Sequence, residues 1–193
     1  YIDGDNERKA LAQILQKIEE FNPQLLILED YNKGLLTEQI ISQIIAFGRS
    51  KGMFIAVDPK ESNFFTYAGV NLFKPNLPEA SHAHHGPLNS SNLGTVSSLW
   101  REENQIETLA ITLGGQGIFL QNGNGAIQVS PDRAIDVIDV CGAGDAVVCA
   151  IALGLMAGLD LEKTGSLANL AGAYVCSHSG VVAVNVGEIY HWI

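Results

Sequence analysis

Apolar positions along this chain follow two different patterns. In residues 11–21 and 40–47 they recur every three or four positions, which predicts two amphipathic helices, the second opened by Thr37. Short uninterrupted apolar runs, each closed by polar or charged residues, predict buried strands. These runs occupy residues 25–28, 54–57, 70–73, 108–113, 117–120 and 126–129. Two later apolar segments, 144–157 and 161–178, predict helices joined by a turn at Gly158.

Strands that alternate with helices predict an α/β fold with a mostly parallel sheet and helices on both faces. A polar region at 79–104 should hold one or two short helices and a loop. The 193 residues, 47% of them hydrophobic, fit a single well-buried α/β domain over residues 1–193. Because chemistry in such sheets gathers at the carboxyl ends of the strands, candidate positions can be read from the strand ends. They are Asp30, Lys33, Asp58, Lys60, Asn76, Glu79, Thr112 and Gly114.

Charge and composition narrow the function classes. The formal net charge of −10 leaves no basic stripe for nucleic acid, although one nucleotide such as ATP needs only a few lysines and a metal ion. No apolar run reaches about 18 residues without interruption, and no signal-peptide pattern is visible, so we expect no membrane association. Three cysteines without C-x-x-C spacing predict reduced thiols and a cytoplasmic protein.

The segment 139–145, D-V-C-G-A-G-D, is the strongest chemical signal. Gly142, Ala143 and Gly144 open an apolar helix, and bare backbone N–H groups at a helix start can cradle an anion. Asp145 lies just inside that first turn, where a carboxylate can accept a proton from an attacking hydroxyl. An anion cradle beside a general base suits phosphoryl transfer to an alcohol. The alternative is a tight strand-to-helix turn with an aspartate near the cap.

Two further segments carry candidate ligands. Asn76 and Glu79 stand one turn apart after a strand and could hold a hydrated Mg²⁺, or could form a helix capping box. The glycine-rich turn at 112–117 could contact a nucleotide or could be an ordinary hairpin. Three lysines follow strand ends and should form a positive patch beside Asp145, since a chain of this net charge repels anions at long range. They are Lys33, Lys60 and Lys74.

The segment 139–145 resembles the D-T-x-G-A-G-D signature of the ribokinase-like (PfkB) sugar kinase family. The resemblance implies a three-layer αβα fold and ATP-dependent phosphotransfer to a sugar or sugar-phosphate hydroxyl, with ATP and Mg²⁺ as cofactors. It assigns the catalytic base to Asp145 and the anion hole to residues 142–144. The segment 76–79 is similar to the P-N-x-x-E motif of the family, which is associated with Mg²⁺ and phosphate.

The same resemblance assigns nucleotide contacts. Residues 112–117 resemble the T-x-G-x-x-G nucleotide loop, which implicates Thr112, Gly114 and Gly117, and Asn169 falls near the adenine. Asp139 with residues 177–184 resembles the potassium site of ribokinase, so K⁺ is a candidate cofactor. The expected partners are a small-molecule sugar or sugar phosphate and a second copy of the chain in a homodimer, with no nucleic acid and no membrane.

Residues 28–36, L-E-D-Y-N-K-G-L-L, look like the L-S-D-Y-x-K-G-x-L segment of the D-glycero-β-D-manno-heptose 7-phosphate kinases. This likeness implies a heptose 7-phosphate substrate. The match covers only the carboxyl-terminal part of a family member, because the early glycine motif and the β-strand lid have no counterpart here. We therefore expect the nucleotide-binding and catalytic part of a longer kinase, without the lid. Two alternatives stay open: another ribokinase-like sugar or nucleoside kinase, and a nucleotide-binding module without catalysis.

Overall fold

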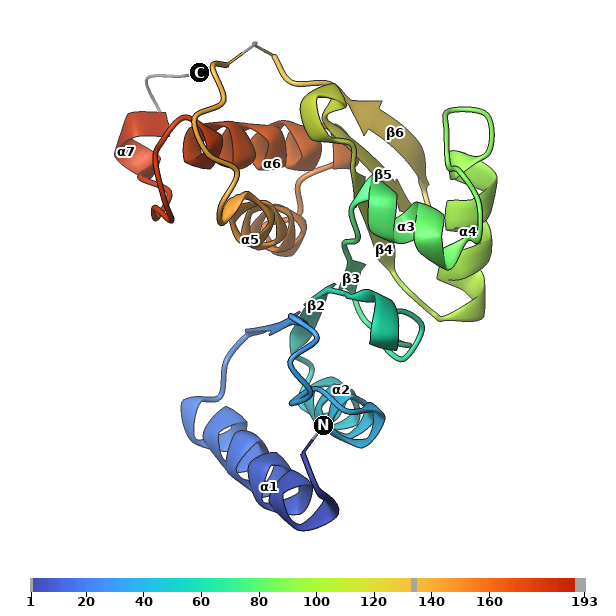
Figure 1. Cartoon of the computed structure of the whole chain (residues 1–193), viewed down its shortest axis with the longest axis vertical. Coiled ribbons are helices and arrows are strands. Elements are labelled where there is room, and N and C mark those ends of the chain that lie inside the picture. Colours follow the sequence, from blue (N-terminus) through green and yellow to red (C-terminus); the bar gives the residue numbers. More distant parts are fainter. Residues whose placement is uncertain (1, 133–134, 190–193) are drawn as a thin grey trace.

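The computed structural model of the chain describes residues 2–132 and 135–189, and its elements follow the predicted order (Figure 1). The strands are β1 (Leu25–Glu29), β2 (Phe54–Asp58), β3 (Leu72–Phe73), β4 (Thr108–Thr112), β5 (Ile118–Asn122) and β6 (Gly125–Val129). The helices are α1 (Gly4–Phe21), α2 (Glu38–Ser50), α3 (Leu77–Ala83), α4 (Leu93–Glu103), α5 (Ala143–Met156), α6 (Leu161–Cys176) and α7 (Val186–Ile189). Two 3₁₀ turns, η1 (Glu61–Asn63) and η2 (Gly114–Gln116), complete the set.

The six strands form one sheet in the order β1-β2-β3-β4-β5-β6. Strands β1 to β4 are parallel, whereas β4, β5 and β6 are joined as antiparallel hairpins. Because β1 to β4 follow one another across the sheet, the crossovers between them all step in one direction. Right-handed crossovers of this kind place the connecting helices on one face of the sheet. The mostly parallel sheet expected from the alternation of strands and helices is therefore confirmed.

Side chains on the two faces of the sheet belong to two separate apolar cores. Ile55, Val57 and Leu109 pack in the core that α1, α2, α3 and α4 help to form. Ala56, Leu72 and Ala110 pack on the opposite face with residues of α5 and α6. The protein is thus a three-layer αβα structure, with α5 and α6 packed against each other (Figure 1).

Alternation along the strands decides which polar residues face α5. On β1 the odd positions Leu25 and Ile27 pack toward the α5 side, whereas Leu28 packs toward the α2 side. On β2, β3 and β4 the even positions face α5. Because successive side chains of a strand point to opposite faces, residues that continue these series past the strand ends converge beneath the start of α5.

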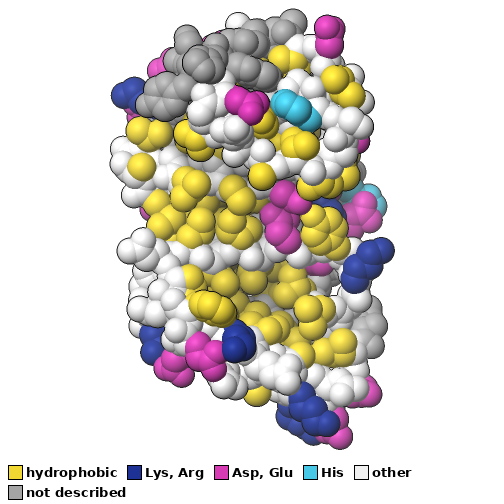
Figure 2. Space-filling model, turned by 90° about the vertical axis from the view of Figure 1, so that its left-hand side faces the viewer, with side chains coloured by type: hydrophobic (Ala, Val, Ile, Leu, Met, Phe, Trp, Pro, Cys, Tyr) yellow, Lys and Arg dark blue, Asp and Glu magenta, His cyan; other side chains and the backbone are white. Residues whose placement is uncertain are grey.

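Strand β1 is an edge of the sheet formed by the described residues. Its residues are mostly half-buried, whereas those of β2 are mostly buried. Figure 2 shows hydrophobic side chains gathered in two bands on the face of the molecule that lies at the left of Figure 1.

No helix among residues 2–132 and 135–189 combines the length and the apolar character that crossing a membrane requires.

Candidate active site at the carboxyl edge of the sheet

Helix α5 begins with a sharp turn that leaves its first N–H groups near the sheet edge. Gly142 is the N-cap with φ 80°, a left-handed conformation that favours glycine, and no side chain caps the helix. The N–H of Ala143 donates to the carbonyl of Val140 at 3.2 Å. The N–H groups of Gly144 and Asp145 have no intrahelical acceptor at this position. Of the predicted anion cradle at 142–144, Ala143 is thus bonded within the turn, whereas the N–H of Gly144 faces the sheet edge together with that of Asp145.

A polar cavity of about 270 Å³ opens in front of this helix start. Its walls come from the carboxyl ends of β1, β2, β3 and β4 and from the first turn of α5, as the parallel-sheet rule predicts. The lining residues are Glu29, Asp30, Tyr31, Asp58, Lys60, Lys74, Asn76, Thr112, Gly144 and Asp145. Most positions picked from the strand ends are thus brought together.

Lys74 does not face the cavity as a free cation. Its Nζ lies 3.0 Å from Oδ2 of Asp58, and its side chain is only 3% exposed. Burial raises the pKa of Asp58, and the ammonium of Lys74 partly opposes that rise. The charge of Lys74 is thus already paired with Asp58, and its role toward a substrate anion remains a prediction.

Lys60, Asn76 and Glu79 form one connected unit. The side chain of Asn76 accepts from the N–H of Glu79, and the carboxylate of Glu79 accepts from the N–H of Asn76, both at 2.8 Å. This capping box begins α3. The other carboxylate oxygen of Glu79 accepts from Lys60. Burial lowers the pKa of Lys60, but this hydrogen bond and the charge of Asp58 outweigh it, so the pKa of Lys60 is raised and the side chain stays charged.

Both carboxylate oxygens of Glu79 thus have donors already, and the capping alternative is confirmed. A metal role for Asn76 and Glu79 remains a prediction. Each carboxylate oxygen can accept more than one hydrogen bond, so contact through water is compatible with this arrangement.

Three carboxylates converge on the cavity. Glu29 and Asp58 are cross-strand partners in the register of β1 and β2, and an oxygen of each lies within 4.8 Å of the other and of one from Asp145. Burial and the charges of Asp58 and Asp145 raise the pKa of Glu29 to about 7. Oxygen donors at such spacing suit a hard divalent cation such as Mg²⁺.

Tyr31 closes the cavity beside Asp145. Its hydroxyl donates to both carboxylate oxygens of Asp145 at 3.1 Å each, while its side chain is largely exposed. The hydrogen bond to Asp145 is the main reason that the pKa of Tyr31 is raised to about 12. The phenol therefore keeps its proton and remains a donor at neutral pH.

Lys33 is not among the residues that line this cavity. It lies exposed on the irregular segment between β1 and α2, where Asn32 and Gly34 have positive φ values. Of the two lysines expected to project beside Asp145, only Lys60 does so. Lys60 and Lys74 line the cavity beside Glu29, Asp58 and Asp145, and the role of the three lysines toward a substrate phosphate remains a prediction.

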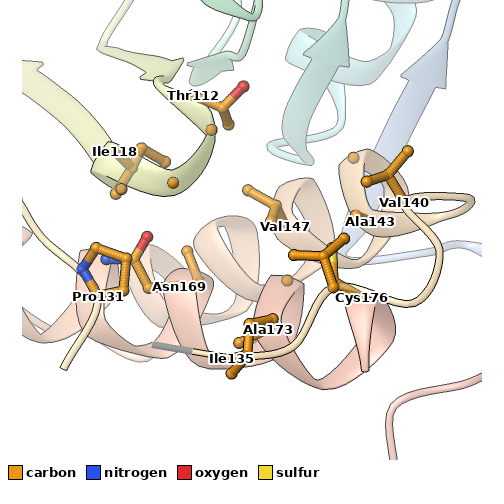
Figure 3. A pocket seen from close by; sticks show the side chains of 17 residues that line it. Thr112, Ile118, Pro131, Ile135, Val140, Ala143, Val147, Asn169, Ala173 and Cys176 are labelled. Atoms are coloured by element: carbon orange, nitrogen blue, oxygen red, sulfur yellow. The ribbon is translucent and has the colours of Figure 1, made fainter. Parts of the chain in front are cut away.

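A second, apolar cavity of about 480 Å³ lies on the other side of the helix start (Figure 3). Thr112, Gly114, Gly117 and Asn169 all line it, as expected for the nucleotide residues. The other walls are Gly115, Ile118, Pro131, Ile135, Val137, Val140, Ala143, Gly144, Val147, Ala168, Gly172, Ala173 and Cys176. Thr112 and Gly144 line both cavities, so the two cavities meet at the start of α5.

Asn169 and Gly117 also stabilise the local structure. The amide of Asn169 donates to the carbonyl of Val129 at 2.9 Å, which ties α6 to β6. Gly117 has φ 90°, and an added β-carbon would lie 2.0 Å from the carbonyl oxygen of Val129. Only glycine fits that turn.

Asp139 joins two distant loops. Its carboxylate accepts from the N–H groups of Cys141 and Gly180 at 3.0 Å each, and these bonds lower its pKa. The structure therefore brings Asp139 to the segment 177–184, as expected. Its role toward a monovalent cation remains a prediction.

Strand-end reasoning missed Glu29 and Tyr31 because it took the residues after each strand without regard to face. The alternation of β1 was the available signal: residues 25 and 27 face α5, so residues 29 and 31 continue that series. Asp30 points the other way, and its carboxylate accepts from Asn63 and Tyr67.

Comparison with known proteins agrees with this architecture. Residues 4–186 match the model of the pfkB family carbohydrate kinases. The chain is 31% identical over 190 residues to the bifunctional protein HldE of Syntrophotalea carbinolica, with 98% of this chain and 38% of that protein covered. It is 34% identical over 190 residues to HldE of Helicobacter pylori, with 97% and 40% covered. The chain thus spans less than half the length of these relatives.

Solved structures show the same fold. Phosphofructokinase-2 from Escherichia coli in complex with potassium superposes with a TM-score of 0.84 at 19% identity, covering 98% of this chain and 62% of that one. Ribokinase from Arabidopsis thaliana complexed with ribose and ATP gives a TM-score of 0.71 at 17% identity, covering 93% and 55%. The chain belongs to the pfkB family of carbohydrate kinases, and its ribokinase-like fold is confirmed.

Proposed function

We propose that this pfkB family member transfers the γ-phosphoryl group of ATP to a hydroxyl of a sugar phosphate, with Asp145 as the general base. One observation carries the proposal: the exposed carboxylate of Asp145 lies in the polar cavity, one residue after Gly144, where that cavity meets the apolar one. A nucleotide in the apolar cavity would have its phosphates at the junction, within reach of an acceptor beside Asp145.

The reaction follows from this layout. The acceptor hydroxyl attacks the γ-phosphorus while Asp145 takes its proton, and the bond from the γ-phosphorus to the bridging oxygen breaks to release ADP. The N–H groups of Gly144 and Asp145, at the positive end of the α5 dipole, stabilise the charge that spreads over the transferring oxygens. The apolar walls, among them Val147, Ala173 and Cys176, would hold the adenine and exclude water (Figure 3).

Bound Mg²⁺ would neutralise phosphate charge during transfer. The residues present fit it, because Glu29 and Asp58 offer oxygens within 4.8 Å of each other and Asn76 and Glu79 can reach it through water, which leaves Asp145 to act as the base. Asp139 with the backbone of residues 177–184 is the candidate K⁺ site.

The acceptor is best described as a heptose 7-phosphate, on the strength of the segment 28–36. The charge of the cavity does not add to this preference, since Lys60 and Lys74 are paired with Glu79 and Asp58. Lys33 stands exposed on the same segment as Tyr31 and is the cation that remains for an acceptor phosphate outside the cavity.

Asp145→Asn tests the reaction. A general base contributes on the order of 10²- to 10⁴-fold to the rate, so kcat for phosphorylation of heptose 7-phosphate should fall by that factor. Affinity for Mg-ATP, measured by calorimetry, should stay within about 2-fold, because the variant keeps the helix start and the apolar cavity. Turnover close to that of the wild type would remove Asp145 from the role of base.

The rival function is a nucleotide-binding module without catalysis, which the 38 to 40% coverage of the relatives keeps open. Mass spectrometry of products from heptose 7-phosphate, fructose 6-phosphate and ribose, each incubated with Mg-ATP, separates the two. Binding of Mg-ATP without any phosphorylated product would favour the module. A product from fructose 6-phosphate or ribose alone would favour another ribokinase-like kinase.

A further inference from the structure

The hydroxyl of Tyr31 is hydrogen-bonded to the carboxylate of Asp145, which the proposed reaction needs as its base. It lies 3.1 Å from each oxygen of Asp145, so one O–H is shared between two acceptors. Hydrogen bonds from a hydroxyl to a carboxylate are usually about 2.5–2.7 Å long. Tyr31 therefore contacts the proposed base through a hydrogen bond that is long and shared between two acceptors. A better-placed hydroxyl can replace such a bond.

The chain on either side of Tyr31 is anchored. The neighbouring Asp30 is 4% exposed, and its carboxylate accepts from the N–H of Asn32 at 2.7 Å, the amide of Asn63 at 2.9 Å and the hydroxyl of Tyr67 at 2.8 Å. The amide of Asn63 also donates to the carbonyl of Leu36, so both ends of the segment 30–36 are tied to η1. With its backbone held, Tyr31 can move mainly by rotation of its own side chain.

Its exposure suits such a rotation. Tyr31 is 58% exposed, whereas Tyr67 on the opposite face of the sheet is 1% exposed. Little apolar area is lost when the Tyr31 ring swings toward solvent, so the hydrogen bond to Asp145 is the main interaction that opposes the movement.

We propose that Tyr31 is a specificity-determining residue that occupies Asp145 until an acceptor sugar displaces it, which makes water a poor phosphoryl acceptor. The inference rests on the proposed function, in which Asp145 is the base. A sugar brings several contacts besides its reacting hydroxyl and can replace the phenol, whereas water brings only its own hydrogen bonds. No proton leaves Tyr31 in this exchange: one hydrogen bond to Asp145 breaks and another forms.

Tyr31→Phe removes the hydroxyl and keeps the ring. ATP hydrolysis without acceptor should rise about 3- to 10-fold, the effect of one hydrogen bond that water no longer has to replace. The KM for heptose 7-phosphate should fall by a similar factor, while kcat with saturating acceptor stays within about 2-fold. Leu99→Ala, at an exposed apolar position of α4 that lines neither cavity, is the control and should leave the ratio of hydrolysis to sugar phosphorylation unchanged.

The outcomes separate this inference from the proposed function. An unchanged ratio in Tyr31→Phe, or a proportional loss of hydrolysis and of sugar phosphorylation, overturns the role of Tyr31 and leaves Asp145 as the base. Absence of sugar phosphorylation in the wild type overturns both proposals.

A measurement without turnover tests the contact itself. With 3-fluorotyrosine at position 31, the ¹⁹F resonance at neutral pH reports the surroundings of the ring. The resonance should shift in the Asp145→Ala variant, because the hydroxyl loses its acceptor, and on addition of heptose 7-phosphate to the otherwise wild-type chain. An identical resonance in all three samples would mean that Tyr31 does not engage Asp145 and would end the inference.

Discussion

Lys74 lies directly beneath the first turn of α5, with its Nζ 3.0 Å from Oδ2 of Asp58. A β-carbon added at Gly144 would lie 3.4 Å from that carboxylate oxygen and 3.9 Å from the lysine nitrogen. The helix therefore begins on top of a buried ion pair. Because the two charges compensate each other, the partial positive charge of the helix start remains for a phosphate.

The buried pair should be costly to break. Lys74→Met leaves buried Asp58 with only Lys60, whose Nζ is 3.9 Å from its other oxygen, and should lower the free energy of unfolding in urea by up to about 3–5 kcal/mol. Asp58→Asn should also destabilise, and the double variant should lose clearly less than the sum of the two. The control is Lys163→Met, which breaks the exposed pair with Asp160 and should cost less than about 1 kcal/mol. Equal losses for the two lysines would contradict the buried pair.

Glu79→Gln separates capping from metal binding. Glutamine keeps the capping box, so the free energy of unfolding should change by less than about 1 kcal/mol. Loss of the carboxylate should raise the Mg²⁺ concentration that half-saturates kinase activity by about 10-fold, as expected for an outer-shell partner. An unaltered Mg²⁺ dependence would restrict Glu79 to capping α3 and pairing with Lys60.

Glu29 should make stability depend on pH. Its pKa is about 7 in the folded protein against 4.5 for an unperturbed glutamate, so the unfolded chain releases this proton first as pH rises. The free energy of unfolding should therefore fall between pH 4.5 and 7. Glu29→Gln should remove this loss and, above pH 7, gain on the order of 1–2 kcal/mol relative to wild type, after allowance for solvent screening at a half-buried site.

Urea unfolding at pH 5.0 and 8.5 in EDTA measures this difference. Glu102→Gln, at an exposed position on α4, keeps Glu29 and should retain the pH dependence of the wild type. A Glu29→Gln variant whose stability tracks that of the wild type across the range would rule out the raised pKa.

Substitution of Lys33 should affect the KM only for acceptors that carry a phosphate group. Lys33→Gln should raise KM for heptose 7-phosphate by about 5- to 10-fold, because one exposed charge contact to a phosphate contributes roughly 1 kcal/mol. The KM for an acceptor without a phosphate group should not change, and the effect should weaken with added salt. Lys9→Gln on α1 is the control for a remote exposed lysine. Equal effects on both acceptors would place the substrate phosphate elsewhere.

Local pattern was enough to predict most of the fold. The apolar runs and the 3/4 spacings place the six strands and the main helices, because burial of one face leaves a period in the chain itself. The short helix α7 was not predicted, since one turn carries no period. Parallel strands must end on the same side of the sheet, so the sequence alone predicted that residues after the strands would meet at one edge. Asp58, Lys60, Asn76 and Thr112 do line one cavity there.

Pairing of the charges was decided only by the tertiary structure. The local sequence does not predict the ion pairs of Lys74 with Asp58 and of Lys60 with Glu79, or the position of Lys33 outside the cavity. Each of these depends on strand register and on the position of α5 over the sheet. The contact of Tyr31 with Asp145 spans 114 positions of the chain. The sequence by itself thus determined which groups stand at the edge of the sheet, and the packing of α5 on that edge decided which of them remain available to a substrate.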